Sequence, residues 1–90
     1  MEILIKKIDN QTFDVSIRNT TESNHVVILD DNSHFKLTQG AKMKEEIILF
    51  SFEFLLEREK NTSILPSFKL EIIQNYFPEY EKSLRNWANL

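Results

Sequence analysis

The clearest hydrophobic pattern in the chain is a strict alternation of apolar and polar residues over residues 12–18, TFDVSIR. Phe13, Val15 and Ile17 would lie on one face of an extended segment, and the polar residues between them on the other. A period of two over seven residues is typical of a β-strand with one face in the core and one in water. We therefore predict a half-buried strand here.

Two further short segments are apolar and rich in β-branched residues, residues 2–8 (EILIKKI) and residues 25–29 (HVVIL). The polar stretches that separate the three segments, DNQ and NTTESN, contain residues that favour turns. The order strand, turn, strand, turn, strand predicts a three-stranded antiparallel meander.

The segment from residue 41 to residue 59 predicts a long helix with an unusual distribution of polar residues. At 100° per residue, five charged residues fall within about 60° of one another, and the apolar residues of the segment cover most of the remaining circumference. A surface helix normally shows the opposite arrangement, a single apolar stripe. We expect a central helix covered by the sheet on one side and by another element on the other. The predicted polar stripe contains Lys42, Glu46, Glu53, Glu57 and Lys60.

Gly40 is the only glycine in the chain. It follows a segment, DDNSHFKLTQ, that begins with residues suited to capping a helix. We predict one short helical turn around Phe35 and Leu37 that ends at Gly40, where the backbone takes a positive φ.

Two short C-terminal helices are predicted, at residues 68–76 and 78–88. Pro78 separates them and suits the first turn of the second helix, because its missing N–H is not needed there. The second helix carries apolar residues at i, i+4, i+7 and i+8, which are Tyr80, Leu84, Trp87 and Ala88. These helices, or a second chain, would cover the far side of the central helix. The predicted fold class is α+β, a single domain over residues 1–90.

Composition excludes several classes of protein. There is no cysteine, so disulfides, thiolate zinc sites and thiol catalysis are excluded, and a reducing compartment such as the cytoplasm is favoured. No apolar run approaches the roughly 20 residues of a membrane-spanning helix, and the N-terminus does not resemble a signal peptide. The net charge is −3, without a cluster of Lys and Arg, which disfavours nucleic acid as a partner.

No constellation of catalytic or metal-binding residues stands out. His25 and His34 flank Asp30 and Asp31, but their spacing matches no zinc or calcium signature. Glu57 and Glu59 lie two apart on a helix and would point in different directions. We expect no enzyme activity, no cofactor, no catalytic residue and no metal site.

The segment YFPEYE, at residues 76–81, joins the two C-terminal helices and gathers residue types that are enriched at protein interfaces. The alternative interpretation is a core corner that holds the last helix in place. The candidate interaction surface consists of Tyr76, Phe77, Tyr80 and Trp87.

One DNA-binding fold fits the order of elements. A strand at 25–29, a short helix and a longer helix form a ribbon-helix-helix repressor or antitoxin, in which two chains pair their strands. The strand has no Arg or Lys, which counts against this alternative. A basic face around Lys36, Lys42 and Lys44 would favour it, and an internal pocket of several hundred Å³ would favour a third alternative, a small-ligand binder.

Residues 25–81 resemble a small group of bacterial proteins of similar length. The resemblance rests on HVVIL followed by Asp30, KLTQG (36–40), SFEFLLERE (51–59), SIL, SF and YFPEYE. It weakens at AKMK (41–44), which lacks the Ser or Pro expected before the paired glutamates. It implies a bacterial, cytoplasmic protein and carries over no activity, cofactor or catalytic residue.

These observations favour a non-catalytic protein–protein interaction module that associates with itself or with another protein partner. Ninety residues offer little material to cover a helix that is apolar over about 300°. A homodimer would close either the far face of the central helix or a strand edge.

Overall fold

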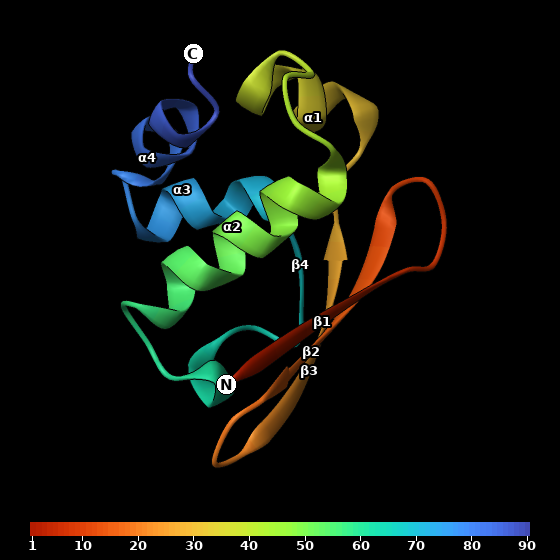
Figure 1. Ribbon diagram of the computed structural model, residues 1–90, viewed down its shortest axis with the longest axis vertical. Coiled ribbons are helices and arrows are strands. Elements are labelled where there is room, and N and C mark those ends of the chain that lie inside the picture. The colour runs from red at the N-terminus through yellow and green to blue at the C-terminus, as the bar shows by residue number, and fades with distance from the viewer.

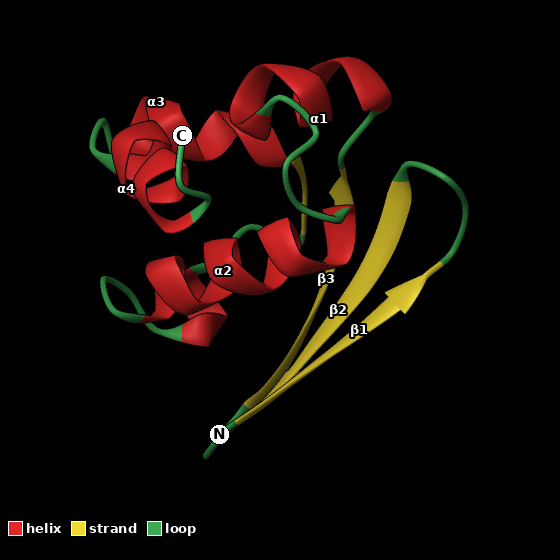
Figure 2. Cartoon of the chain, turned by 45° about the horizontal axis from the view of Figure 1, so that its top comes forward, coloured by secondary structure: helices red, strands yellow, loops and turns green.

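The computed structural model describes all 90 residues and shows an α+β architecture. A four-stranded mixed sheet covers one side of the central helix, and the other helices cover its opposite side (Figures 1 and 2). The strands are β1 (Glu2–Lys7), β2 (Thr12–Arg18), β3 (Glu22–Ile28) and β4 (Ser67–Lys69). The α-helices are α1 (Asp31–Thr38), α2 (Lys44–Leu56), α3 (Ile73–Tyr76) and α4 (Tyr80–Trp87).

The predicted antiparallel meander is present as β1, β2 and β3, but it is only part of the sheet. The sheet has a fourth strand, β4, which pairs with β3 in parallel. In addition, β3 begins at Glu22, three residues before the predicted start. The side chain of Ser23 explains the longer strand, because its Oγ bonds to His25 and accepts a hydrogen bond from the buried Asn61.

Strand β2 has the predicted two faces. Phe13, Val15 and Ile17 are completely buried, and the residues between them are only half-buried. The alternation in the sequence therefore identified the core face of the sheet correctly.

Helix α2 is central, as predicted, but it is 13 residues long and does not extend over residues 41–59. Residues 41–43 lie outside it, because the Ala41 N–H bonds back to Thr38 and Met43 is extended. The Glu46 carboxylate accepts a hydrogen bond from the Met43 N–H at 3.0 Å, so a glutamate caps the helix in place of the expected Ser or Pro. At the other end, the chain turns at Glu57, and the N–H groups of Arg58 and Glu59 both reach the Leu55 carbonyl.

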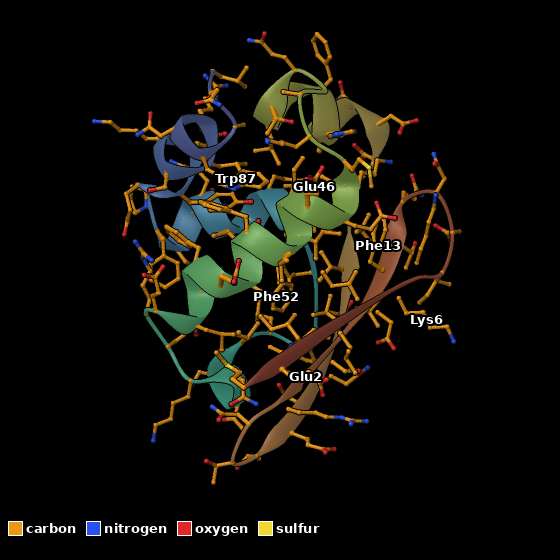
Figure 3. All side chains as sticks on the ribbon, in the orientation of Figure 1. Glu2, Lys6, Phe13, Glu46, Phe52 and Trp87 are labelled. Carbon is orange, nitrogen blue, oxygen red and sulfur yellow. The ribbon has the colours of Figure 1, made fainter.

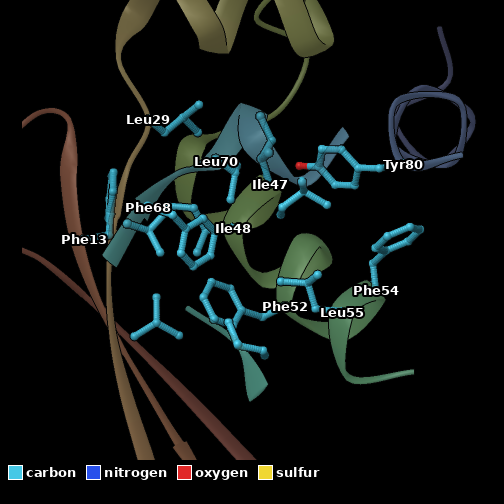
Figure 4. Close-up of a cluster of buried hydrophobic side chains, with 14 of the residues drawn as sticks. Phe13, Leu29, Ile47, Ile48, Phe52, Phe54, Leu55, Phe68, Leu70 and Tyr80 are labelled. Atoms are coloured by element: carbon cyan, nitrogen blue, oxygen red, sulfur yellow. The ribbon is translucent and has the colours of Figure 1, made fainter. Parts of the chain in front are cut away.

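The far side of α2 is covered within the same chain. Figure 4 shows Phe52 near Phe68, toward the sheet, and Phe54 near Tyr80, on the side of the last helix. The α2 residues that are buried in the core are Ile47, Ile48, Phe52, Phe54 and Leu55.

The predicted helix at residues 68–76 is wrong in its first half. Ser67–Lys69 form β4, Leu70–Ile72 form a 3-10 turn, and only Ile73–Tyr76 are α-helical. The final helix is shorter than predicted, at Tyr80–Trp87, but its apolar stripe packs inward. Tyr80, Leu84 and Ala88 are buried.

The predicted turn before Gly40 is a full helix, α1, with Asp30 as its N-cap. The Asp30 carboxylate accepts a hydrogen bond from the Ser33 N–H at 2.8 Å. Gly40 has the predicted positive φ, 76°, and follows Gln39, which is also left-handed. None of the helices combines the length and apolar character that crossing a bilayer demands.

The hydrogen bonds at these turns predict an acid-sensitive fold. The Gln11 N–H lowers the pKa of the Asp9 carboxyl, and the Ser33 N–H lowers the pKa of the Asp30 carboxyl. The Lys44 ammonium lowers the pKa of the Asp31 carboxyl. A lowered folded-state pKa gives stability that is present above the unfolded-state pKa and is lost as the pH falls through the folded-state value. The urea midpoint should therefore fall between about pH 5 and about pH 2.

Burial raises the pKa of the Glu59 carboxyl, which has the opposite effect on the pH dependence of stability. It is one carboxyl against three, so the net effect of acid is still a loss of stability. The matched control is Asp30→Asn, which keeps a capping side chain and removes its titration. This variant should show a smaller acid-induced change than the wild type. A wild-type midpoint that stays constant over that pH range would contradict the prediction.

Candidate functional site

The four residues of the predicted interaction surface have different environments. Tyr80 is completely buried, and its hydroxyl lies 2.6 Å from the Ser51 Oγ. Ser51 donates its own proton to the Ile47 carbonyl at 2.7 Å, so Tyr80 is the donor of the shared bond. Burial raises the pKa of the Tyr80 phenol, which keeps it neutral. The structure therefore places Tyr80 in the core.

Trp87 and Phe77 are half-buried against α2. The Trp87 ring stacks on Phe50 with centroids 4.8 Å apart, and the Lys42 ammonium lies 5.1 Å from the centre of the Trp87 ring. Phe77 packs edge-on against Phe54 at 6.0 Å. Of the four residues, only Tyr76 is mainly exposed, at 63%. It is the part of this corner that is free for contact.

Tyr76 and Phe77 also line a small apolar pocket between the end of α2 and α3. The pocket has a volume of about 130 Å³. A second depression, of about 640 Å³, lies between the β2–β3 turn and the loop after α2, and its lining is mostly polar. The small pocket is lined by Leu55, Glu59, Ser63, Ile64, Leu65, Phe68, Ile72, Ile73, Tyr76 and Phe77.

The histidines and aspartates that flank the start of α1 do not converge. Both ring nitrogens of the buried His25 are bonded, Nδ1 to the Leu65 carbonyl at 2.8 Å and Nε2 to Ser23 at 2.9 Å. His34 bonds the Lys42 carbonyl instead, and Asp31 pairs with Lys44. No group of three or more His, Asp and Glu side chains is arranged to hold a metal ion.

The acidic residues at the end of α2 are arranged around Arg58. Its guanidinium lies 3.5 Å from the centre of the Phe54 ring and pairs with Glu79 at 3.1 Å and with Glu57 at 3.9 Å. Glu57 is exposed, and Glu59 lies at the rim of the apolar pocket. The two carboxylates thus have separate surroundings.

The lysines that would form a basic face are engaged with other groups. Lys44 is buried, and its ammonium bonds the Asp31 carboxylate and the Asn10 carbonyl, both at 2.7 Å. Lys42 lies over the Trp87 ring. Lys36 remains exposed, but alone it is not a basic surface.

The sheet has two edge strands, β1 and β4, and β1 is the longer of the two, with six residues against three. The strand order is β1-β2-β3-β4, so β1 has a neighbour on one side only (Figure 1). Its pairing with β2 is continuous over six residues. Ile3 and Ile5 face the core but are only partly buried, and Leu4, on the outer face, is 44% exposed. The sheet therefore ends in an apolar strand.

Alternation of the hydrogen bonds shows which backbone groups of β1 are free. The Ile8 N–H donates to the Thr12 carbonyl at 2.9 Å, so the even-numbered residues of this strand face β2. The N–H and C=O groups of Ile3 and Ile5 therefore point to the open edge. A three-stranded meander, as predicted from the sequence, has its first strand at one edge. The additional strand β4 pairs with β3 on the opposite side, so the edge of β1 stays open.

No family model, curated protein or solved structure matches the chain. The resemblance over residues 25–81 and the bacterial origin it implies therefore stay predictions.

Proposed function

We propose that this protein is a non-catalytic protein–protein interaction module that associates with itself through the open edge of β1. The observation that carries the proposal is the combination of free backbone groups at Ile3 and Ile5 with the exposed Leu4 between them. A free strand edge is a template for pairing with another strand, because its unpaired N–H and C=O groups are spaced to meet a partner.

Burial favours the strand edge over the far side of α2 as the surface for association. The C-terminal helices cover α2 in the same chain, and Leu49, at 39%, is the only large apolar residue of the helix among the clearly exposed ones. Most of the apolar surface of α2 is thus buried within the same chain.

The two alternative functions have less support. In a ribbon-helix-helix dimer the strand that precedes the first helix must be free to pair with a second chain, whereas β3 lies between β2 and β4. The apolar pocket, at about 130 Å³, is below the roughly 300 Å³ at which ligand sites usually begin. The depression of about 640 Å³ is large enough, but its lining is mostly polar, whereas ligand sites are lined mainly by apolar side chains. We propose no nucleic acid or small-molecule ligand, and a cytoplasmic location, which suits a chain without cysteine.

Mass in solution tests the proposal. Light scattering on a sizing column should give a mass that rises from 10.7 kDa towards twice that value as the concentration increases from micromolar to millimolar. A mass of 10.7 kDa throughout this range would contradict self-association.

The corner around Tyr76 is a second candidate surface, and a variant separates it from β1. Tyr76→Ala should leave the mass unchanged from wild type at every concentration, because Tyr76 belongs to α3 and not to the sheet edge. Loss of self-association in Tyr76→Ala, with the fold intact by circular dichroism, would transfer the interface to the corner.

A further inference from the structure

The sequence of β1 is complementary to itself when read in the opposite direction. Glu2-Ile3-Leu4-Ile5-Lys6 has Leu4 at its centre, isoleucines on either side and opposite charges at the ends. Building on the proposed self-association, we propose that two copies of the chain pair their β1 strands antiparallel, about a two-fold axis that passes beside Leu4. The two four-stranded sheets then form one continuous sheet of eight strands.

The backbone permits this register. With Leu4 opposite Leu4 of the second copy, Ile3 of each copy lies opposite Ile5 of the other. Ile3 and Ile5 are the residues whose N–H and C=O groups point to the open edge, so each such pair can exchange two hydrogen bonds. In a register shifted by one residue, the free N–H and C=O groups of Ile3 and Ile5 would face even-numbered residues of the second copy, whose own backbone groups already bond β2.

Charge complementarity favours the same register. Glu2 and Lys6 lie at opposite ends of β1 on the outer face (Figure 3). In the proposed dimer, each Glu2 lies opposite Lys6 of the other copy, which gives two pairs of opposite charge. Opposite charges directly across a ladder stabilise the pairing, whereas like charges destabilise it.

These pairs continue a charge pattern that already exists within the sheet. Arg18 of β2 lies between Glu2 and Glu22, at 3.8 and 3.9 Å, so the signs alternate across three strands. At the other end of the strand, Lys6 lies opposite Asp14. In the proposed dimer, Lys6 of the second copy lies next to Glu2, and Glu2 of the second copy lies next to Lys6. The alternation of sign therefore continues across the interface.

The edge also lacks features that prevent pairing. Edge strands of monomeric proteins are commonly interrupted by a proline, a bulge or a charge that points inward. Residues 2–6, which would pair, contain no proline, their register with β2 is unbroken, and their inward residues are Ile3 and Ile5. Lys7, the last residue of β1, is on the inward side but lies beyond the paired residues. Pairing in the proposed register would cover these half-buried isoleucines with those of the second copy.

Charge reversal tests the register. Glu2→Lys places two lysines opposite two lysines in the homodimer, and Lys6→Glu places two glutamates opposite two glutamates. Each variant alone should dimerise roughly ten- to a hundredfold more weakly than wild type. An equimolar mixture should recover the dimer, because every facing pair in the mixed dimer is again of opposite charge. Glu22→Lys is the matched control, since it also removes a partner of Arg18 but lies on β3.

Cysteine substitution gives an independent measurement in a chain that has no cysteine of its own. The two Leu4 Cα atoms would lie about 4.5 Å apart, within the range that a disulfide spans. Leu4→Cys should form a covalent dimer on mild oxidation. Glu2→Cys alone should not, because two copies of residue 2 would be about 14 Å apart along the strands. Glu2→Cys mixed with Lys6→Cys should cross-link.

The outcomes separate this inference from the proposed function. A wild-type protein that stays monomeric at all concentrations overturns both. A wild-type dimer that survives Glu2→Lys and Lys6→Glu, or a mixture of the two that stays monomeric, overturns the Leu4-centred register and leaves self-association standing. Recovery in the mixture together with the Leu4→Cys cross-link establishes the register.

Discussion

Replacement of Phe52 with alanine is expected to lower the free energy of unfolding by about 3–5 kcal/mol, because it removes a large aromatic side chain from the core and leaves a cavity. Phe52 is completely buried between helix and sheet. Its ring lies 5.6 Å from His25 and 6.0 Å from Phe68, so the cavity would border both β3 and β4. A domain of 90 residues has a total stability of about 5–13 kcal/mol, so the variant retains a small margin or none.

Urea unfolding monitored by circular dichroism measures this effect. Leu49→Ala is the matched control, since Leu49 belongs to the same helix but is 39% exposed, and its replacement should cost less than about 1 kcal/mol. Equal effects for the two variants would contradict the assignment of Phe52 to the centre of the core.

Leu84→Ala is expected to cost about 2–5 kcal/mol, although Leu84 lies on the last short helix of the chain. Leu84 is completely buried and belongs to the same cluster as Phe54 and Tyr80. A large cost is the signature of a helix that closes the far side of α2, because a helix that only rested on the surface would tolerate the change.

Lys82→Ala is the control on the same helix, since Lys82 is exposed, and it should change the free energy of unfolding by less than about 0.5 kcal/mol. If Leu84→Ala were as mild as Lys82→Ala, α4 would not be the cover of α2. The apolar far side of α2 would then need another occupant, and a second copy could bind there instead of at β1.

The parts of the fold that follow local periodicity could be predicted from the sequence. The alternation in β2 identified Phe13, Val15 and Ile17 as core, and the spacing in the last helix identified the apolar face that packs inward, which includes Leu84. Both patterns repeat over enough residues to define a face.

The errors occur where a contact far along the chain determines the local structure. β4 has three residues, with one apolar side chain, Phe68, and it forms because Val26 to Ile28 offer a free edge about 40 residues earlier. Such a segment has no period of its own. The spacing of Leu70, Ile72 and Ile73 mimics a helical stripe, so the strand and the 3-10 turn were predicted as one helix.

The candidate interaction surface was also predicted only in part, because the burial of its residues depends on contacts far along the chain. The residue types in the 76–87 corner indicated an interface, but residue type does not distinguish an interface from a well-packed core. Tyr80 is buried because Ser51 provides a hydrogen-bond partner for its hydroxyl. The edge position of β1 follows from the predicted meander, but the pairing of β4 with β3, which leaves that edge open, could not be predicted, since it is a property of the whole topology.

Hydrogen exchange at the edge of β1 reports directly on whether a second strand pairs there. The amides of Leu4 and Lys6 face β2 and should be protected at every protein concentration, which makes them an internal control. The amides of Ile3 and Ile5 should exchange rapidly at micromolar concentration and slow down as the concentration rises to millimolar. Rapid exchange of Ile3 and Ile5 at all concentrations, with Leu4 and Lys6 protected, would show that no second strand pairs with β1 and would contradict the account.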